Sequence, residues 1–383
     1  MGETRNMFDP RVWYDHANQR WVTCAVDKKV ENGELDLMIK VSKTSSPSLA
    51  ASNWYPYEVP ISVETGETID FPTLGSDTNG YYISVQIKSG SAPQINKGYR
   101  IQALKKPEVL GPGYTPPSLL TVTAAELDTW AIQPAFSYET SPTGGYAWFV
   151  AKAGTRKIYY RRLQWNGSTP DWVGTWTPLS DTSYLDYYDV PQDDSFSVPQ
   201  SGGSVDIGAT GSRLMTAVIR NGYLWTCHHV GLDGTDGDYD GGTPDRSAAQ
   251  WFKLAVQSGG LTYTTHGRIY DASTSNPYSY YFPSLNVDNN GRVVFGFSGS
   301  KTAEHVGGFF TGRTSTGTMM NRPVLVQAGR APTTLDRWGD YSATTMDPTD
   351  DSFWTAQEYA IWDLDIPAFF RWGTWITRIK SSQ

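Results

Sequence analysis

Residues 281–295 read YFPSLNVDNNGRVVF, and this stretch decides the fold. A proline follows an aromatic residue, a short apolar run leads into an Asp-Asn-Asn-Gly turn, and a β-branched strand comes next. Residues 71–83, FPTLGSDTNGYYI, repeat this order. Asp, Asn and Gly between aromatic and β-branched runs favour a tight reversal, so both stretches are predicted strand–turn–strand hairpins.

The same pattern recurs along the chain, with anchors at residues 10, 72, 134, 208, 283 and about 339. Each unit has room for a four-stranded propeller blade with long loops. The sequence therefore predicts an all-β fold, a six-bladed β-propeller in a single domain. The predicted blades are 9–69, 70–129, 130–204, 205–279, 280–335 and 336–383, with residues 1–8 closing the ring. Seven blades, a jelly roll or a pair of sandwiches are the alternatives.

Composition excludes several classes of protein. The 383 residues are 39% hydrophobic, 14% aromatic and only 18% charged, whereas soluble domains average about 25% charged residues. The aromatic content excludes a disordered chain, and no apolar run reaches the ~18 residues of a membrane span. A net charge of -8 argues against a nucleic-acid partner. We expect a soluble monomer rich in loops.

The two cysteines, Cys24 and Cys227, lie inside predicted strands. They fall in blades one and four, which are opposite in a ring of six, so we expect two buried free thiols and no disulfide.

The C-terminal third resembles a group of mostly uncharacterised, secreted bacterial β-propeller proteins. The stretches that carry the resemblance are residues 281–287, 291–300, 337–344, 357–360 and 372–376, together with the opening residues 9–15. The resemblance implies a propeller and an exported or periplasmic protein. Residues 1–8 have no apolar signal core, so we expect the leader to be absent from this chain. The architecture is similar to that of sialidases, but the Asp-box S-x-D-x-G-x-T-W does not occur.

Charged residues recur where the inner strand of each unit begins, at the expected mouth of a central channel. A glycoside-cleaving enzyme needs two carboxyl groups, one protonated and one ionised. Asp70 and Asp340 are the predicted catalytic pair, with Asp9 as the alternate. The alternative is structural, since an Asp can cap a turn and an Asp–Arg pair can lock neighbouring blades.

Further residues are predicted to contact a substrate. Arg11 and Arg337 could bind an acidic group through their guanidinium forks. Tyr341, Tyr281 and His228 are the other predicted binding residues. His228 and His229 are consecutive in a strand and point to opposite faces, which argues against a shared zinc site.

An acidic loop is the candidate metal site. Asp233, Asp236, Asp238 and Asp240 alternate with glycines, a pattern that suits the oxygen coordination of Ca²⁺. The loop lacks the last glutamate of an EF-hand, and a solvated acidic loop is the alternative. Calcium is the only cofactor that the sequence predicts.

The clustered rings Trp165, Trp172 and Trp176 are interpreted as packing between blades, with sugar stacking as the alternative. The sequence thus predicts an exported carbohydrate-active propeller, either a glycoside hydrolase or a polysaccharide lyase. A non-catalytic propeller that binds a polysaccharide or a protein is the alternative, and a calcium-stabilised esterase or lactonase is a weaker one.

Overall fold

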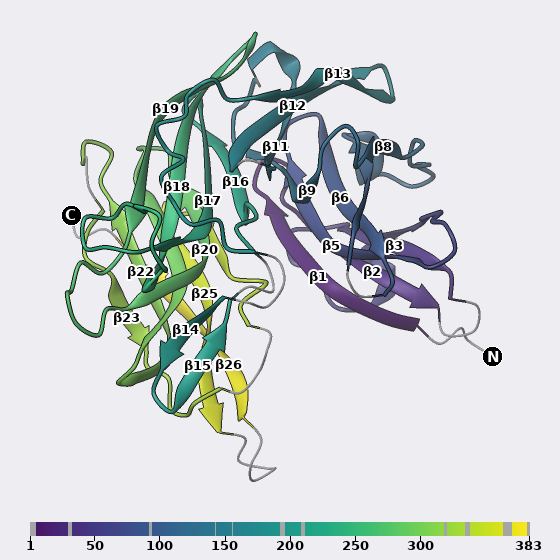
Figure 1. Ribbon diagram of the computed structural model, residues 1–383. Helices are drawn as coiled ribbons and strands as arrows, with labels where there is room; N and C mark the ends of the chain where they lie inside the picture. Colours follow the sequence, from purple (N-terminus) through teal and green to yellow (C-terminus); the bar gives the residue numbers. More distant parts are fainter. Residues whose placement is uncertain are drawn as a thin grey trace. The chain divides into compact units, whose positions relative to one another are not determined.

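Strands form almost all of the regular structure (Figure 1). The computed structural model describes residues 5–29, 33–91, 94–141, 143–154, 156–191, 196–207, 211–317, 320–333, 338–362 and 370–380. The prediction of an all-β fold is confirmed. The chain divides into two compact units, unit 1 with residues 1–179 and 257–260, and unit 2 with residues 180–256 and 261–383. No helix in the described ranges is long and apolar enough to cross a membrane.

The described strands of unit 1 form three successive antiparallel meanders. The first comprises β1 (Arg5–Asp15), β2 (Arg20–Lys29), β3 (Leu35–Ser42) and β4 (Trp54–Pro60). The second comprises β5 (Glu67–Ser76), β6 (Gly80–Ser89), β7 (Asn96–Lys105) and β8 (Leu120–Thr123). The third comprises β9 (Thr129–Pro134), β11 (Ala147–Ala153), β12 (Lys157–Asn166) and β13 (Thr169–Pro178). The short β10 (Phe136–Ser137) pairs in parallel with β5. Apart from the step over β10 between β9 and β11, the paired strands are neighbours in the chain, as expected of a hairpin meander.

Unit 2 repeats this plan. Its first meander comprises β16 (Thr216–Arg220), β17 (Tyr223–Leu232), β18 (Arg246–Gln257) and β19 (Gly260–Ile269). The second comprises β20 (Ser279–Val287), β21 (Val293–Lys301), β22 (Glu304–Arg313) and β23 (Val324–Gln327). The third comprises β24 (Ala343–Met346), β25 (Phe353–Trp362) and β26 (Phe370–Ile379). A separate hairpin joins β14 (Ser197–Gln200) to β15 (Gly203–Asp206). Three 3-10 turns, Ala51–Asn53, Glu108–Leu110 and Thr143–Gly145, complete the described regular structure of the two units.

The predicted boundaries of the blades stay a prediction. Residues 5–8 lie in β1 and pair with β2. The number of blades and the closure of a single ring remain predictions.

Strands β1, β5 and β20, each the first strand of its meander, contain a β-bulge at an X-Pro step. Asp9, Phe71 and Phe282 have φ values of 55°, 46° and 50°, and each precedes a proline. The pairing register shifts across all three sites, so that two residues oppose one on the partner strand. A residue other than glycine in this region costs about 1–3 kcal/mol, so surrounding contacts must hold each bulge in place.

Aspartates stabilise the hairpin turns that follow these three strands. Asp15 Oδ1 accepts hydrogen bonds from the amides of Ala17 and Asn18, at 3.1 and 3.2 Å. Asp77 Oδ1 accepts from Asn79 and Gly80, at 2.7 and 2.9 Å. Asp288 does the same in the 281–295 stretch, with the amides of residues 290 and 292. The turns predicted at Asp77 and Asp288 are therefore held by side chain to backbone bonds.

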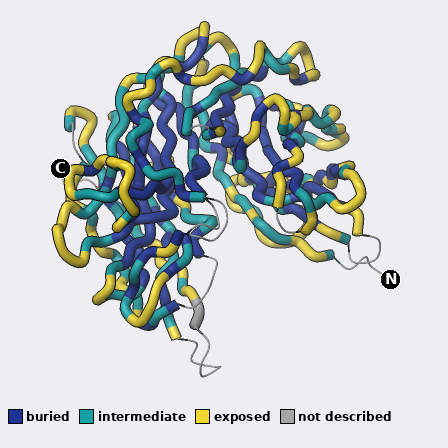
Figure 2. Tube along the Cα trace, in the orientation of Figure 1, coloured by how far each residue is buried: buried dark blue, intermediate teal, exposed yellow. Residues whose placement is uncertain are grey.

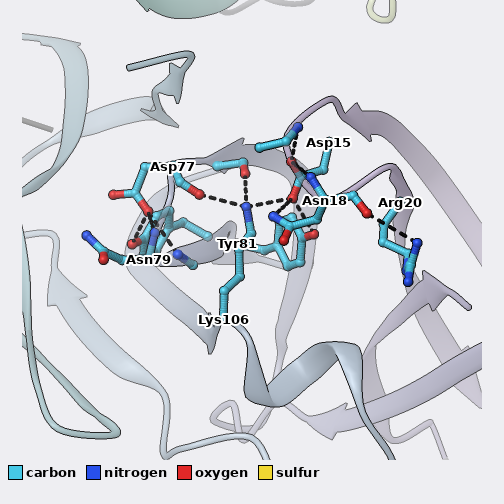
Figure 3. Close-up of polar contacts among 11 residues, drawn as sticks. Asp15, Asn18, Arg20, Asp77, Asn79, Tyr81 and Lys106 are labelled. Carbon is cyan, nitrogen blue, oxygen red and sulfur yellow. Dashed lines mark hydrogen bonds and ion pairs between the residues drawn. The ribbon is translucent and has the colours of Figure 1, made fainter. Parts of the chain in front are cut away.

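Two of these turns meet at a buried lysine in unit 1. Lys106 Nζ lies 2.8 Å from Asp15 Oδ2 and donates to Ser76 Oγ and to the Asp77 carbonyl, at 2.9 and 2.6 Å (Figure 3). Tyr81 donates its hydroxyl to the same Asp15 oxygen at 2.7 Å. The cluster ties the end of β1 to the β5–β6 turn and to the end of β7.

Large rings fill the space between the sheets. Phe149 contacts Tyr82 and Trp172 edge-on, with ring centroids 5.7 and 5.0 Å apart. Trp176 is buried, and Trp165 and Trp172 pack against the same cluster, which confirms the packing interpretation. Buried positions run along the strands, and exposed positions gather in the connections (Figure 2).

Both cysteines are buried free thiols, as predicted. Burial raises the pKa of Cys24 to about 12 and raises the pKa of Cys227 further still. Neither thiol is set up to react at neutral pH.

Candidate functional site

Glu358, in the middle of β25, is the carboxyl group of unit 2 with the most suggestive environment. Its Oε2 accepts a hydrogen bond from the Gly339 amide at 3.0 Å. Burial raises the pKa of Glu358, and the charge of the neighbouring Asp340 raises it further, while the Gly339 amide opposes the change. A carboxyl group that resists ionisation beside a second carboxyl group is the arrangement that acid–base chemistry uses.

The Gly339 backbone is held by a close contact with the bulge of β20. Gly339 has φ +66°, and a Cβ added there would lie 2.4 Å from Phe282 Cδ2. Phe282 is the positive-φ residue of the bulge, and the ring of His229 packs edge-on against it with centroids 5.0 Å apart. His229 Nδ1 accepts from the Phe282 amide at 3.4 Å. Glycine is therefore required at 339 by both conformation and space.

Asp340 and Tyr341 follow Gly339 directly and are half-buried. Both residues lie in the turn before β24, whose first residue, Ala343, pairs with Ala356 on β25. We define the Glu358 site by the residues His229, Phe282, Gly339, Asp340, Tyr341 and Glu358. All six belong to unit 2.

In unit 1, the predicted residues Asp9 and Arg11 hold the bulge of β5. Asp9 Oδ2 accepts from the Phe71 amide at 3.2 Å. Arg11 donates Nε to the Pro72 carbonyl at 2.9 Å and stacks its guanidinium 5.0 Å from the Phe71 ring centroid. These contacts join β1 to β5. They are the structural role that the sequence offers as the alternative for Asp9 and Arg11. Their part in catalysis or binding stays a prediction.

Asp70 forms an ion pair with Lys88, whose Nζ also donates to Gln94 Oε1 at 2.9 Å. Asp70 belongs to unit 1 and Asp340 to unit 2. The assignment of Asp70 and Asp340 as one catalytic pair stays a prediction.

Tyr281 and His228 lie in the core of unit 2, each with 0% exposure. Tyr281 donates its hydroxyl to Ser300 Oγ at 2.9 Å, and His228 Nδ1 lies 2.8 Å from the Ser212 carbonyl. A substrate could reach neither side chain without a rearrangement of the strands. Arg337, the remaining predicted binding residue, lies outside the described residues.

The acidic loop is organised by its own carboxylates. Asp233 accepts from the amides of Asp240 and Gly242, at 2.9 and 2.5 Å, and Asp236 accepts from the Asp238 amide at 3.1 Å. Asp238 also pairs with Arg268 at 2.9 Å. Among the residues that the structure describes, no group of three or more His, Cys, Asp or Glu side chains is arranged to hold a metal ion. Calcium binding stays a prediction.

Sequence reasoning missed Glu358 because it looked for charge where the inner strands begin. Glu358 lies on the second strand of its sheet, in the run FWTAQEYAIW. The available signal is that Glu358 is the one charged residue in this strand, since a partly buried charge needs a partner or a function.

Comparison with known proteins gives distant structural similarities. No family model matches the chain, and no curated protein matches it. Among solved structures, an endo-arabinase from Bacteroides thetaiotaomicron is 16% identical with a TM-score of 0.37, over 84% of this chain and 94% of that one. A Trypanosoma rangeli sialidase in complex with 2,3-difluorosialic acid is 12% identical with a TM-score of 0.41, over 92% of this chain and 51% of the sialidase. The GH43_1 enzyme from Xanthomonas citri complexed with xylotriose is 11% identical with a TM-score of 0.37, over 77% and 83%. Similarities at this level assign neither a family nor an activity to this chain.

Proposed function

We propose that this protein cleaves glycosidic bonds, with Glu358 as the proton donor and Asp340 as the carboxylate that stays ionised. The observation that supports the proposal is the half-buried Glu358 carboxyl group, whose Oε2 accepts from the Gly339 amide at 3.0 Å and whose pKa is raised by burial and by the charge of Asp340. Glycoside hydrolysis requires two such carboxyl groups whose environments separate their protonation states.

The chemistry follows from that difference. Protonated Glu358 would give its proton to the glycosidic oxygen as the bond to the anomeric carbon breaks. Ionised Asp340 would stabilise the positive charge that develops on the sugar ring or would activate the attacking water. Tyr341, which follows Asp340 and is half-buried, is the proposed substrate contact on the same segment. The Gly339 amide fixes the Glu358 carboxyl group while the reaction proceeds.

The test compares the wild type with Glu358→Gln on a panel of neutral and acidic polysaccharides. We expect new reducing ends from the wild type, and a rate at least about 100-fold lower from the variant, because general acid catalysis contributes about that much. Glu304→Gln is the matched control in the same unit. Contacts with Tyr278 and Lys301 outweigh burial and hold the pKa of Glu304 below its usual range, so the control removes a carboxyl group that lacks the acid function.

Three outcomes decide the proposal. Equal rates for wild type and Glu358→Gln, or no cleavage of any polysaccharide, would overturn it. Unsaturated products that also depend on Glu358 would assign a polysaccharide lyase in place of a hydrolase. Saturable binding without cleavage would favour the non-catalytic binding propeller.

Two further expectations remain proposals. We propose that the protein acts outside the cytoplasm, which the resemblance of residues 281–300 and 337–344 to secreted propellers supports. We also propose that the loop of residues 233–242 binds Ca²⁺, supported by carboxylates at alternate positions between glycines.

A further inference from the structure

Two cationic side chains of unit 2 stack on the same tryptophan ring. Trp225 of β17 pairs directly with Lys253 of β18, and directly opposed residues of an antiparallel pair share one face of the sheet. Lys253 Nζ lies 5.3 Å from the centroid of the Trp225 ring. Arg313, the last residue of β22, places its guanidinium carbon 5.1 Å from the same centroid. Two positive charges from different sheets therefore meet at one indole.

Two more rings complete this cluster, which we call the Arg313 site, formed by Tyr223, Trp225, Trp251, Lys253 and Arg313. Lys253 Nζ lies 3.8 Å from the Tyr223 ring centroid, and the Arg313 guanidinium carbon lies 5.0 Å from that of Trp251. The Trp225 and Trp251 rings are in contact, with centroids 5.5 Å apart. These two indoles are 2% and 3% exposed, whereas Tyr223, Lys253 and Arg313 are half-buried. The cations therefore cover two buried indoles and stay partly accessible themselves.

The charge of the two cations is not balanced within their own sheets. Strands β16 to β21 and β23 contain no aspartate or glutamate. β22 begins with Glu304, at the opposite end of the strand from Arg313, and Glu304 pairs with Lys301 at 2.9 Å. Among the residues that the structure describes, neither Lys253 nor Arg313 forms an ion pair or a hydrogen bond.

The pKa values of the two cations respond to burial and to each other. Burial lowers the pKa of Arg313, and burial together with the charge of Arg313 lowers the pKa of Lys253. No carboxylate of the described residues opposes either change. Arg313 Nε and Trp251 Nε1 are buried, and no described oxygen accepts a hydrogen bond from either atom. Like charges held together and buried donors without acceptors both destabilise the folded state unless an acceptor binds.

The other stacked cations in the described part of unit 2 have a carboxylate beside them. Lys301 Nζ lies 4.2 Å from the Tyr278 ring centroid and 2.9 Å from Glu304 Oε1. Arg378 also stacks on an indole and pairs with Asp350 at 2.7 Å. In both cases stacking and ion pairing occur together, so stacking alone does not account for the lack of a carboxylate at the Arg313 site.

We propose that the Arg313 site binds an oxyanion, supplied either by the carboxylate of an acidic sugar or by a free sulfate or phosphate ion. The planar guanidinium of Arg313 can donate two parallel N–H bonds to such a group, and the Lys253 ammonium can donate a third. The bound charge would replace the repulsion between the two cations with attraction to both. Binding of this kind requires no cleavage, so the site does not depend on the proposed hydrolase.

Isothermal titration calorimetry of the wild type with galacturonate, sulfate, phosphate and neutral galactose tests the proposal. Sodium chloride holds the ionic strength constant, because salt screens exposed charges. None of these probes contains a glycosidic bond, so turnover cannot obscure binding. We expect saturable binding of at least one oxyanion and none of galactose. Binding of galacturonate alone would identify an acidic sugar as the ligand, and binding of sulfate or phosphate alone would identify a free ion.

The variants Lys253→Met and Arg313→Met each remove one charge and keep an apolar stem over the indoles. Each should weaken binding at least about tenfold, because hydrogen bonds between charged groups are stronger than neutral ones. Arg313→Lys keeps the charge and loses the fork, so its affinity should lie between those of the wild type and Arg313→Met. If Arg313→Met fails to fold, Lys253→Met keeps the test valid.

Lys301→Met is the matched control. It removes a stacked cation of the same unit that already has Glu304 as its partner, so its affinity should equal that of the wild type. An equal loss of affinity in Lys301→Met and Lys253→Met would overturn the proposal, because it would show an effect of net charge and not of this site.

Three further results would overturn the proposal. These are no binding of any oxyanion, binding of galactose as tight as that of galacturonate, or wild-type affinity in Lys253→Met. The proposed hydrolase is tested separately. Oxyanion binding without cleavage of any polysaccharide would contradict the hydrolase and leave this site standing, and cleavage that depends on Glu358 without oxyanion binding would do the reverse.

Discussion

The pair formed by Lys106 and Asp15 allows a quantitative test of what holds unit 1 together. Their side chains are 4% and 6% exposed, and their charged atoms lie 2.8 Å apart (Figure 3). Removing one partner of a buried pair leaves an uncompensated charge and costs about 3–5 kcal/mol, whereas replacing both partners with hydrophobic residues of similar volume is often nearly neutral. We therefore expect Lys106→Met and Asp15→Asn to be strongly destabilising, and the double variant to cost much less than their sum.

The surrounding hydrogen bonds rank the two single variants. After Lys106→Met, the Asp15 carboxylate still accepts from Tyr81, from the Asn18 side chain and from two backbone amides, so we expect a cost of about 3 kcal/mol. After Asp15→Asn, the buried ammonium group keeps Ser76 Oγ and the Asp77 carbonyl, both neutral acceptors. The cost should then approach about 5 kcal/mol.

Urea denaturation and scanning calorimetry measure both costs. Two compact units need not unfold together, so more than one unfolding transition can be present. The transition whose midpoint shifts in these variants is the one to assign to unit 1. A loss of about 3 kcal/mol lowers the melting temperature of a domain of this size by about 6–12 °C. Costs that add in the double variant, or a cost below about 1 kcal/mol for Lys106→Met, would refute the reasoning.

The same pair fixes a dependence on pH. Burial works to raise the pKa of Asp15, but Lys106, Tyr81 and Asn18 outweigh burial and hold the pKa below its usual range. A carboxyl group with a lowered pKa contributes stability above its unfolded pKa of about 3.9 and loses it as the pH falls through the folded value. The difference in unfolding free energy between wild type and Asp15→Asn should therefore be constant near neutral pH and shrink below about pH 4.

Three further predictions concern unit 2. Because the pKa of Glu358 is raised, ionisation of this carboxyl group destabilises the folded state. Glu358→Gln should therefore raise the melting temperature at about pH 7 and leave it unchanged at about pH 3, where glutamate is protonated in the folded and unfolded states. A rise in melting temperature at both pH values would contradict this. Gly339→Ala should lower the free energy of unfolding, measured by urea denaturation, by more than about 2 kcal/mol, because φ at Gly339 is +66° and an added Cβ would lie 2.4 Å from Phe282. Gly222→Ala is the control, with φ +76° and nothing within 4 Å of an added Cβ, and should lower it by about 1 kcal/mol. Equal losses would show that the close approach to Phe282 is harmless. Calcium should raise the melting temperature, and Asp236→Asn should reduce the rise; no shift with calcium or with chelator would end the calcium proposal.

The strands and turns of this protein could be predicted from local chemistry. Asp77 and Asp288 precede Asn-Gly turns, and the structure shows their carboxylates bonding to the turn amides. The packing of Trp176 was also predictable, since large rings are needed between sheets. These features depend on residues that are close together in the chain.

The candidate site could be predicted only in part. The sequence predicts Asp340 from its place just before a strand, whereas Glu358 lies inside the following strand, where no turn or strand start marks it. Tyr281 and His228 were expected to face a ligand and are fully buried instead. The alternation of a strand does not say which face is covered by a neighbouring sheet, so such assignments need the tertiary packing.

The bulges of β1, β5 and β20 have a consequence for how the repeats tolerate insertions and deletions. In a regular strand, a single inserted residue turns every later side chain to the opposite face. At the bulge of β1, Phe8 pairs with Val26 and Arg11 with Cys24, so the two flanking side chains share a face although they are three positions apart. Asp9 and Pro10 together lie opposite the single residue Ala25, so the extra residue is confined to the bulge. Deleting Pro10 would restore an uninterrupted ladder without moving any flanking side chain to the other face. The X-Pro step is therefore the position where inner strands of different repeats can differ in length by one residue, and where an alignment of the repeats needs its gap.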